Sequence, residues 1–171
     1  MTAARQERKQ FRVRLAAAAF AALVLPVPAL PALAPVAHAA ITERIVVDWH
    51  TGLAIDGYDP VAYFTDSKPL PGSADIELRY GGVVWRFRNI GNRAAFAARP
   101  DVYMPQFGGY DPLGIGRGVA VAGNPTVWRI SGARLFLFYD RARLASFNAD
   151  PDRAMAAADR KWPEVRRTLS P

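Results

Sequence analysis

The residues best suited to bind a ligand lie in one short segment, Pro-Gln-Phe-Gly-Gly-Tyr-Asp-Pro at 105–112. Gln106, Tyr110 and Asp111 place an amide, a phenol and a carboxylate beside aromatic rings. The glycine pair between them lets a ligand approach the backbone closely. These groups predict a small pocket for a polar or cationic ligand. The alternative is a rigid turn that Asp111 caps and Tyr110 packs, which is the commoner use of such residues.

The tetrapeptide Gly-Tyr-Asp-Pro occurs twice, at 57–60 and at 109–112. Two such loops could flank one site, with Tyr58 and Asp59 facing the loop 103–111. Alternatively, the tetrapeptide simply begins a helix twice, because Asp accepts backbone N–H bonds at an N-cap and Pro fits the first turn. We see no longer repeat around either copy, which favours the second interpretation. The predicted ligand-binding residues are Tyr58, Asp59, Tyr103, Gln106, Gly108, Gly109, Tyr110 and Asp111.

Catalytic and metal-binding side chains are scarce. The chain has no Cys, which excludes disulfides, thiolate metal sites and a Cys nucleophile, and we see no Ser nucleophile motif. His50, beside Asp48, could act as a general base with a nearby Asp, although a structural histidine is the simpler interpretation. A metal site would need oxygen ligands such as Asp56, Asp59 and Asp111. We expect no metal, no cofactor and no enzymatic activity, and keep both alternatives open.

Residues 1–39 have the composition of a secretory signal peptide. A basic stretch precedes an unbroken apolar run at 15–25, and a proline-rich segment ends at Ala37-His38-Ala39, the small-x-small pattern of a cleavage site. The apolar run is shorter than the roughly 20 residues that a membrane-spanning helix needs. We therefore expect a mature domain at 40–171 in the periplasm or outside the cell. An uncleaved N-terminal anchor is the alternative.

The leader accounts for much of the basic character of the chain. The whole sequence has 22 Lys and Arg against 15 Asp and Glu, a net charge of +7, but five of the basic and one of the acidic residues precede position 40. The remaining net charge of +3 gives little reason to expect nucleic-acid binding. Six arginines make the C-terminal region basic, which indicates a solvated helical face; the alternative is weak contact with an anionic membrane surface or with an acidic partner. They are Arg141, Arg143, Arg153, Arg160, Arg166 and Arg167.

The pattern of 40–171 predicts one α+β domain, a small antiparallel sheet of hairpins with short flanking helices. The Gly81-Gly82 turn predicts a hairpin that pairs Tyr80 with Val83, Leu78 with Trp85, Ile76 with Phe87, Glu77 with Arg86 and Asp75 with Arg88. A second hairpin is expected at 126–139. Its apolar second strand predicts a central position. We also expect a short strand at 45–49.

Helices are expected where Asp or Asn can cap them. The predicted starts are Asp59-Pro60, Asn89, Asp111-Pro112, Asp140 and Asp150-Pro151. Pro163 should kink or end the last helix.

Eight motifs together resemble the YHS domain family, in particular its exported bacterial branch. They are Gly-Tyr-Asp-Pro-Val-Ala-Tyr-Phe at 57–64, Tyr-Gly-Gly-Val-Val-Trp-Arg-Phe at 80–87, Asn-Arg-Ala-Ala-Phe at 92–96, Arg-Pro-Asp-Val-Tyr at 99–103, Pro-Gln-Phe-Gly-Gly-Tyr at 105–110, Gly-Asn-Pro-Thr-Val-Trp at 123–128, Leu-Phe-Leu at 135–137 and Ala-Ala-Asp-Arg-Lys-Trp-Pro at 157–163. The resemblance spans roughly 52–163.

What the resemblance implies is limited by the residues that depart from the family pattern. Metal-associated members carry three cysteines, whose positions here are Ala62, Arg88 and Asn92, and the exported branch usually carries a further Cys and an Ala at Asp111 and Pro112. None of these residues is a soft metal ligand, and a cationic guanidinium would repel a metal. The resemblance therefore implies that the fold is kept and that the metal site is absent.

These observations predict a non-enzymatic, periplasmic YHS-like binding or interaction module. Its partner would be a small polar ligand or another protein. The alternatives are an acid–base enzyme that uses His50 with a nearby Asp, and a metal-handling protein that uses oxygen ligands.

Overall fold

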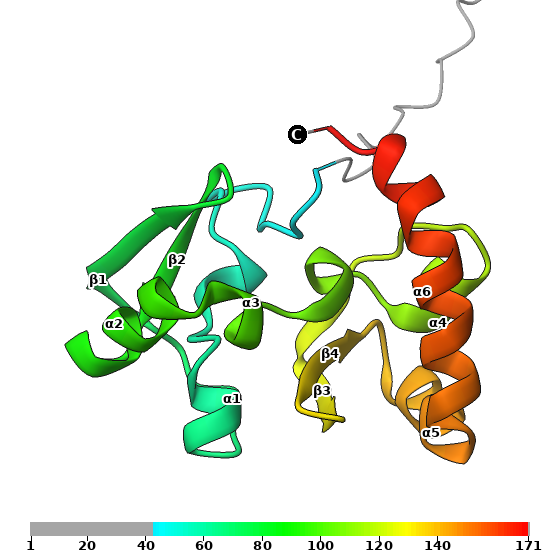
Figure 1. Ribbon diagram of the computed structural model, residues 1–171. Helices are drawn as coiled ribbons and strands as arrows, with labels where there is room; N and C mark the ends of the chain where they lie inside the picture. The colour runs from blue at the N-terminus through cyan, green and yellow to red at the C-terminus, as the bar shows by residue number, and fades with distance from the viewer. Residues whose placement is uncertain (1–42, 171) are drawn as a thin grey trace, which may run out of the picture. The chain divides into compact units, whose positions relative to one another are not determined.

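The computed structural model describes residues 43–170. The predicted leader at 1–39 lies outside the described residues. The elements run in the order η1 (Ile55–Gly57), α1 (Ala62–Thr65), β1 (Ser73–Tyr80), β2 (Val83–Phe87), α2 (Ile90–Ala98), α3 (Pro100–Tyr103), η2 (Gln106–Gly109), α4 (Pro112–Gly116), β3 (Asn124–Ser131), β4 (Arg134–Phe138), α5 (Arg141–Ala149) and α6 (Pro151–Arg167), where η marks a 3₁₀ turn (Figure 1).

The fold is α+β, as predicted, with two antiparallel two-stranded sheets among the described residues instead of one sheet. In the β1–β2 hairpin, Tyr80 pairs with Val83, Leu78 with Trp85 and Glu77 with Arg86, which confirms the predicted register near the turn. A bulge between Ser73 and Glu77 then shifts the register, so that Ser73 pairs with Phe87. The predicted pairings of Ile76 with Phe87 and of Asp75 with Arg88 are therefore wrong.

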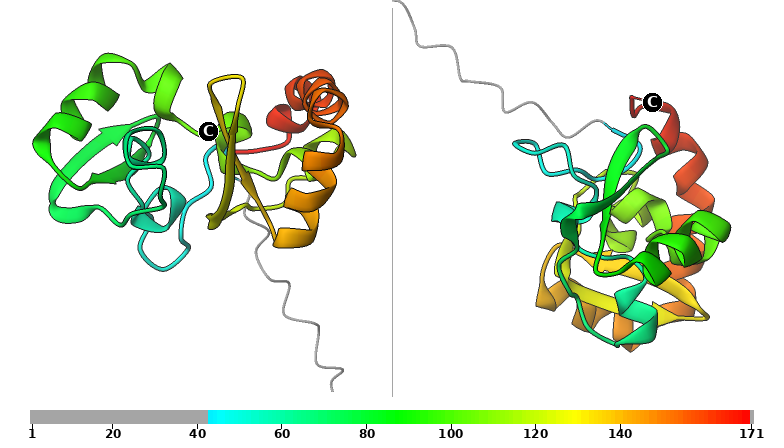
Figure 2. Two further views of the ribbon diagram at one scale, coloured as in Figure 1. Left: turned by 90° about the horizontal axis from the view of Figure 1, so that it is seen from below. Right: turned by 90° about the vertical axis from the view of Figure 1, so that its left-hand side faces the viewer.

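Strand β4 lies between two hydrophobic cores (Figure 1 and Figure 2). Phe136 and Phe138 pack into one core with helices α5 and α6, whereas Leu135 and Leu137 pack into the other with residues of the β1–β2 hairpin. All four side chains are fully buried. Side chains alternate across a strand, so β4 supplies both cores at once. Burial on both faces agrees with its apolar sequence, but the predicted central position in a sheet is wrong, because within residues 43–170 β4 pairs with β3 alone in a two-stranded sheet.

The two hairpins belong to an internal repeat. Each follows a 3₁₀ turn and a Gly-Tyr-Asp-Pro loop, and each is followed by a helix that Asn89 or Asp140 caps. The bulges also match, between Ser73 and Glu77 in one hairpin and between Asn124 and Trp128 in the other. We name residues 55–103 repeat 1 and residues 107–167 repeat 2. The expectation that no longer repeat surrounds the tetrapeptide is therefore wrong.

The sequence carries a faint signal of this repeat. Beyond the tetrapeptide, matching positions share Phe96 with Phe147 and the dipeptide Pro100-Asp101 with Pro151-Asp152. We see no longer identical run than the tetrapeptide, because packing tolerates many substitutions as long as size and polarity pattern are kept.

Each tetrapeptide loop contains one buried aspartate, which hydrogen-bonds to the residue at the end of the following hairpin. Asp59 accepts hydrogen bonds from the backbone N–H of Val61 (2.8 Å) and of Arg88 (2.8 Å) and from the side-chain amide of Asn92 (2.7 Å). Both Asp59 and its counterpart Asp111 are fully buried. Each carboxylate therefore joins a helix start to the residue that follows the second strand of the hairpin.

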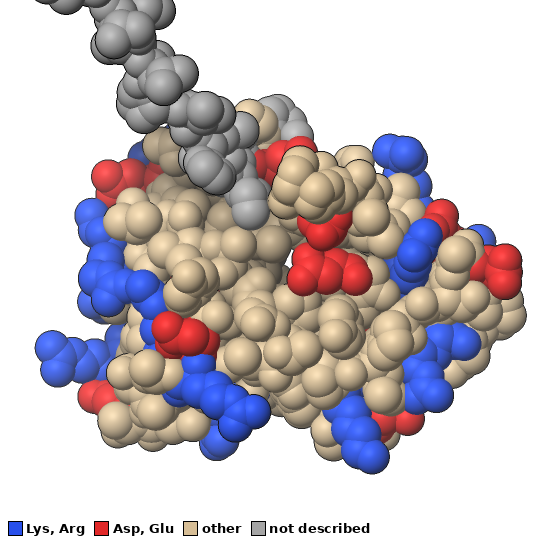
Figure 3. All heavy atoms as spheres, turned by 180° about the vertical axis from the view of Figure 1, so that it is seen from behind, with Lys and Arg blue, Asp and Glu red and all other residues tan. Residues whose placement is uncertain are grey.

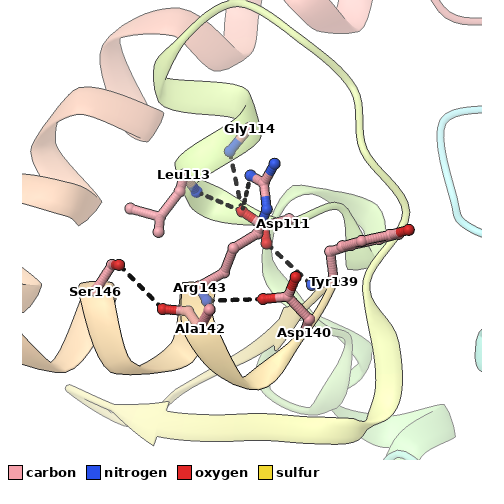
Figure 4. Close-up of polar contacts among 8 residues, drawn as sticks. All are labelled: Asp111, Leu113, Gly114, Tyr139, Asp140, Ala142, Arg143 and Ser146. Atoms are coloured by element: carbon pink, nitrogen blue, oxygen red, sulfur yellow. Dashed lines mark hydrogen bonds and ion pairs between the residues drawn. The ribbon is translucent and has the colours of Figure 1, made fainter.

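Asp111 makes the corresponding contacts in repeat 2 (Figure 4). It accepts from the backbone N–H of Leu113 (2.8 Å), Gly114 (2.9 Å) and Tyr139 (3.0 Å), and the guanidinium of Arg143 lies 3.5 Å away. Buried carboxylates need such partners, because an unpaired charge is costly to bury.

The predicted strand at 45–49 is wrong, and so is a helix end at Pro163, whereas the alternative of a kink at Pro163 stays a prediction. Residues 45–49 do not form a strand; only Val47 makes a bridge, to Ala54, because Asp48 accepts hydrogen bonds from His50 and Thr51 and turns the chain back. Helix α6 also continues past Pro163 to Arg167. Among residues 43–170, none of the helices combines the length and the apolar character that a membrane crossing requires.

Removing either buried carboxylate should destabilise the protein strongly. We expect Asp59→Ala and Asp111→Ala each to lower the free energy of unfolding by about 3 kcal/mol, because buried N–H donors lose a charged acceptor. Urea denaturation measures the change. Asp75→Ala, which removes an exposed carboxylate, is the control and should change stability by less than about 0.5 kcal/mol. Equal effects of the three variants would contradict the role given to Asp59 and Asp111.

Candidate functional site

The largest cavity described here lies between the two repeats and has a volume of about 760 Å³. Its walls come from the tip of the β1–β2 hairpin, the segment 101–108 and helix α6. Arg44 and Ile45, from the segment that precedes η1, complete the lining. We call it the inter-repeat cavity. Its size falls within the range of about 300–1,000 Å³ that is typical of small-molecule sites.

Of the predicted ligand-binding residues, Gln106 and Gly108 line this cavity. The side-chain oxygen of Gln106 accepts a hydrogen bond from Arg134 (3.0 Å), and Arg134 in turn pairs with Asp159 of α6 through two hydrogen bonds (2.7 and 3.1 Å). The guanidinium also lies over the rings of Phe107 and Phe136. The orientation of Gln106 is therefore fixed, and its amide nitrogen makes no hydrogen bond to a described residue.

Gly108 and Tyr110 hold the N-terminal segment at the edge of the cavity. The carbonyl of Gly108 accepts a hydrogen bond from the backbone N–H of Val46 (2.8 Å), and the hydroxyl of Tyr110 donates to the carbonyl of Glu43. Gly108 has a φ of +66°, and a Cβ there would overlap the carbonyl oxygen of Arg44. These two residues therefore position Arg44, although only Gly108 lines the cavity itself.

The other predicted site residues serve the fold. Asp59 and Asp111 are buried and their oxygens are occupied by the contacts described above. Tyr58 and Tyr103 pack against the core of repeat 1, and the carbonyl of Gly109 accepts a hydrogen bond from Gly123 (3.0 Å). The two Gly-Tyr-Asp-Pro loops thus do not line the inter-repeat cavity together. The helix-start interpretation is confirmed for the second tetrapeptide, where Asp111 caps α4. It is wrong for the first, because α1 begins at Ala62 with Val61 at its N-cap.

The alternatives based on catalysis and on metal binding find no matching geometry. His50 lies in the exposed turn that Asp48 caps, with its ring against that of Trp49, and it does not line the inter-repeat cavity. Asp56 is exposed while Asp59 and Asp111 are buried. In the part of the chain that the structure describes, no three His, Asp or Glu side chains gather as a metal site.

Sequence reasoning does not include the arginines and aromatics of this cavity among the ligand-binding residues; Arg166 is named there only as part of the basic C-terminal region. Arg44 and Arg166 line it, and neither makes an ion pair within residues 43–170. Tyr80, Phe107 and Trp162 supply an aromatic wall. Asp101 is the one carboxylate of the lining, and it pairs with Arg99. No local pattern joins these residues, because they come from distant parts of the chain.

The comparisons with known proteins gave no match, either to a protein-family model, to a curated protein or to a solved structure. The resemblance to the YHS family therefore stays a prediction.

Substitution of Gly108 should test how tightly the N-terminal segment is held. We expect both Gly108→Ala and Gly132→Ala to lower the free energy of unfolding. The loss should be greater for Gly108→Ala, by about 2 kcal/mol or more. Both glycines have a positive φ, but an added Cβ meets open space at Gly132 and backbone atoms at Gly108. Urea denaturation of both variants gives the comparison. Equal losses would show that the contact with Arg44 is unimportant.

Tyr110 should make stability depend on alkaline pH. Burial raises the pKa of Tyr110 from 10 to about 12. Because the neutral phenol is favoured in the folded state, this contribution to stability is present below pH 10 and is lost as the pH rises toward 12. Urea denaturation at increasing pH should show a smaller decline for Tyr110→Phe than for the wild type. The exposed Tyr139→Phe control should leave the decline unchanged.

Proposed function

We propose that the protein is a binding module for small organic anions with an aromatic or apolar body. The observation that carries this proposal is the lining of the inter-repeat cavity, which combines Arg44 and Arg166 with the rings of Tyr80, Phe107 and Trp162. Guanidinium groups match carboxylates, sulfonates and phosphates in charge and geometry, and aromatic walls bury the body of such a ligand.

The charge of the lining favours an anion over the cationic ligand that the segment 105–112 alone would suggest. Both arginines lack an ion-pair partner among the described residues, whereas the nearby Asp101 has Arg99. Positively charged side chains therefore outnumber negatively charged ones in the lining. The free amide nitrogen of Gln106 adds a neutral donor from the same wall.

The distribution of charge gives no comparable support to nucleic acid. On the face shown in Figure 3, Lys and Arg are gathered toward the edges, mixed with Asp and Glu, and a broad uncharged area separates them. A nucleic-acid site would need a continuous basic surface. The weak membrane contact and the protein partner stay predictions. No feature of the face shown in Figure 3 favours either of them.

The proposal includes a YHS-like fold and export to the periplasm or beyond. One observation fits the resemblance: the positions that correspond to the family cysteines, Ala62, Arg88 and Asn92, all contact Asp59. Here a carboxylate surrounded by N–H donors takes the place that a thiolate site would need. We therefore propose that ligand binding in this protein uses the inter-repeat cavity and does not involve a metal.

A pair of isosteric ligands tests the proposal. Naphthoate should bind the protein about tenfold more tightly than the neutral naphthamide, equivalent to about 1.4 kcal/mol, because only naphthoate pairs with the arginines. Calorimetry measures both affinities, and Trp162 provides a fluorescence signal at the cavity wall. In the double variant Arg44→Ala/Arg166→Ala the preference for the anion should disappear.

The matched control is Arg93→Ala/Arg160→Ala, which removes the same charge from two exposed arginines that make no ion pair within residues 43–170. This variant should retain the preference for naphthoate. Equal affinities of the wild type for the two ligands, or a preference that survives loss of Arg44 and Arg166, would overturn the proposal.

A further inference from the structure

Repeat 2 carries an arginine where repeat 1 shows that a neutral amide suffices. Asn92 and Arg143 occupy the same place, three residues after the caps Asn89 and Asp140, and the backbone N–H of each donates to its cap. Asn92 holds the buried Asp59 with a hydrogen bond of 2.7 Å, whereas the Nη1 of Arg143 lies 3.5 Å from Asp111. The longer contact indicates that Arg143 is not needed to tie the loop to the hairpin.

The remaining donors of Arg143 are available. Only Nη1 of its guanidinium makes a hydrogen bond or ion pair with a described residue, and Arg143 keeps 26% of its side-chain surface exposed. The guanidinium also stands over the ring of Tyr139, which is itself exposed. Contacts with Asp111 and Tyr139 together orient the planar group without using up its hydrogen-bonding capacity. Figure 4 shows the guanidinium between α4 and α5, above Asp111.

Arg143 lines a second cavity, of about 580 Å³, between α4, α5 and α6. Arg117 from the end of α4 and Arg153 from α6 line the same cavity, which we call the arginine pocket. Within residues 43–170, neither Arg117 nor Arg153 makes an ion pair. The wall from α6 is specific to repeat 2, because this helix has 17 residues and its counterpart α3 has four.

The acidic residues of the pocket are engaged as helix caps. Asp140 accepts a hydrogen bond from the backbone N–H of Arg143 (2.8 Å), and Asp150 accepts one from that of Arg153 (3.1 Å). Their charges are partly balanced by the N-terminal ends of α5 and α6, where carboxylates are favourable. The three guanidinium groups therefore dominate the polar chemistry that the pocket offers to a ligand.

We propose that the arginine pocket binds a small oxyanion of the phosphate type, either the free ion or the phosphoryl end of a phosphate monoester. Planar guanidinium groups bind tetrahedral oxyanions through paired, charge-assisted hydrogen bonds. The pocket lies apart from the inter-repeat cavity and shares none of its lining residues. The ligand of the arginine pocket would be a small, highly charged ion. The ligand of the inter-repeat cavity would be larger, with an aromatic or apolar part that packs against the aromatic wall.

Arg143→Asn is the decisive variant, because it introduces the residue type found at the matching position of repeat 1, Asn92. Phosphorus NMR and calorimetry with inorganic phosphate and with phenyl phosphate, at constant ionic strength in chloride, measure binding. The wild type should bind at least one of the two, and Arg143→Asn should weaken that binding tenfold or more while retaining a cooperative unfolding transition. Tighter binding of phenyl phosphate would identify a monoester as the ligand, and equal or tighter binding of phosphate the free ion.

Two further variants keep the test valid if Arg143→Asn is poorly folded. Arg117→Ala and Arg153→Ala alter exposed side chains and should each weaken phosphate binding severalfold. The matched control, Arg141→Asn, removes an arginine from the same helix outside the pocket and should leave binding unchanged. The variant Arg44→Ala/Arg166→Ala should also retain phosphate binding. Absence of binding beyond the chloride control, or equal binding by the pocket variants and Arg141→Asn, would overturn the proposal.

Discussion

The buried carboxylates of Asp59 and Asp111 are the constraint on which the rest of the structure depends. Each joins the start of a short helix to the residue after the second strand of a hairpin, so that a loop, a helix and a sheet are fixed by one side chain. A buried charge is tolerated only when it is fully paired, and both carboxylates are. The same chemistry that suggests a ligand site in the sequence therefore stabilises the fold.

Strand β4 connects the two repeats through packing. Because its two faces enter different cores, repeat 1 has no complete core of its own: Leu135 and Leu137 of repeat 2 fill the core of repeat 1, whereas the other core contains no residue of repeat 1. The repeats must consequently remain together, and the segment that links them is held between them. The inter-repeat cavity results from this arrangement, and its arginines come from the two ends of the described chain.

The two repeats differ most in their last helices. Repeat 1 ends in the short helix α3, whereas repeat 2 extends into α6, which supplies a wall to both cavities. They also differ beside the buried carboxylate, where repeat 1 has Asn92 and repeat 2 has Arg143. A duplicated unit can keep its supporting contacts in one copy and vary them in the other, since the fold requires only that the carboxylate be paired.

Much of the local structure follows from the sequence. The Gly81-Gly82 turn, the caps Asn89 and Asp140, the α+β class and the apolar strand at 134–138 are predictable, because turns, caps and alternation depend on residues that are neighbours along the chain.

Burial and the proximity of distant segments decided which polar residues serve the fold and which line a cavity. Only the tertiary structure shows that Asp59 and Asp111 are enclosed, that Gly108 and Tyr110 hold the segment carrying Arg44, and that Arg117, Arg143 and Arg153 share one pocket. Distant segments meet through packing, and the availability of a polar group depends on what covers it.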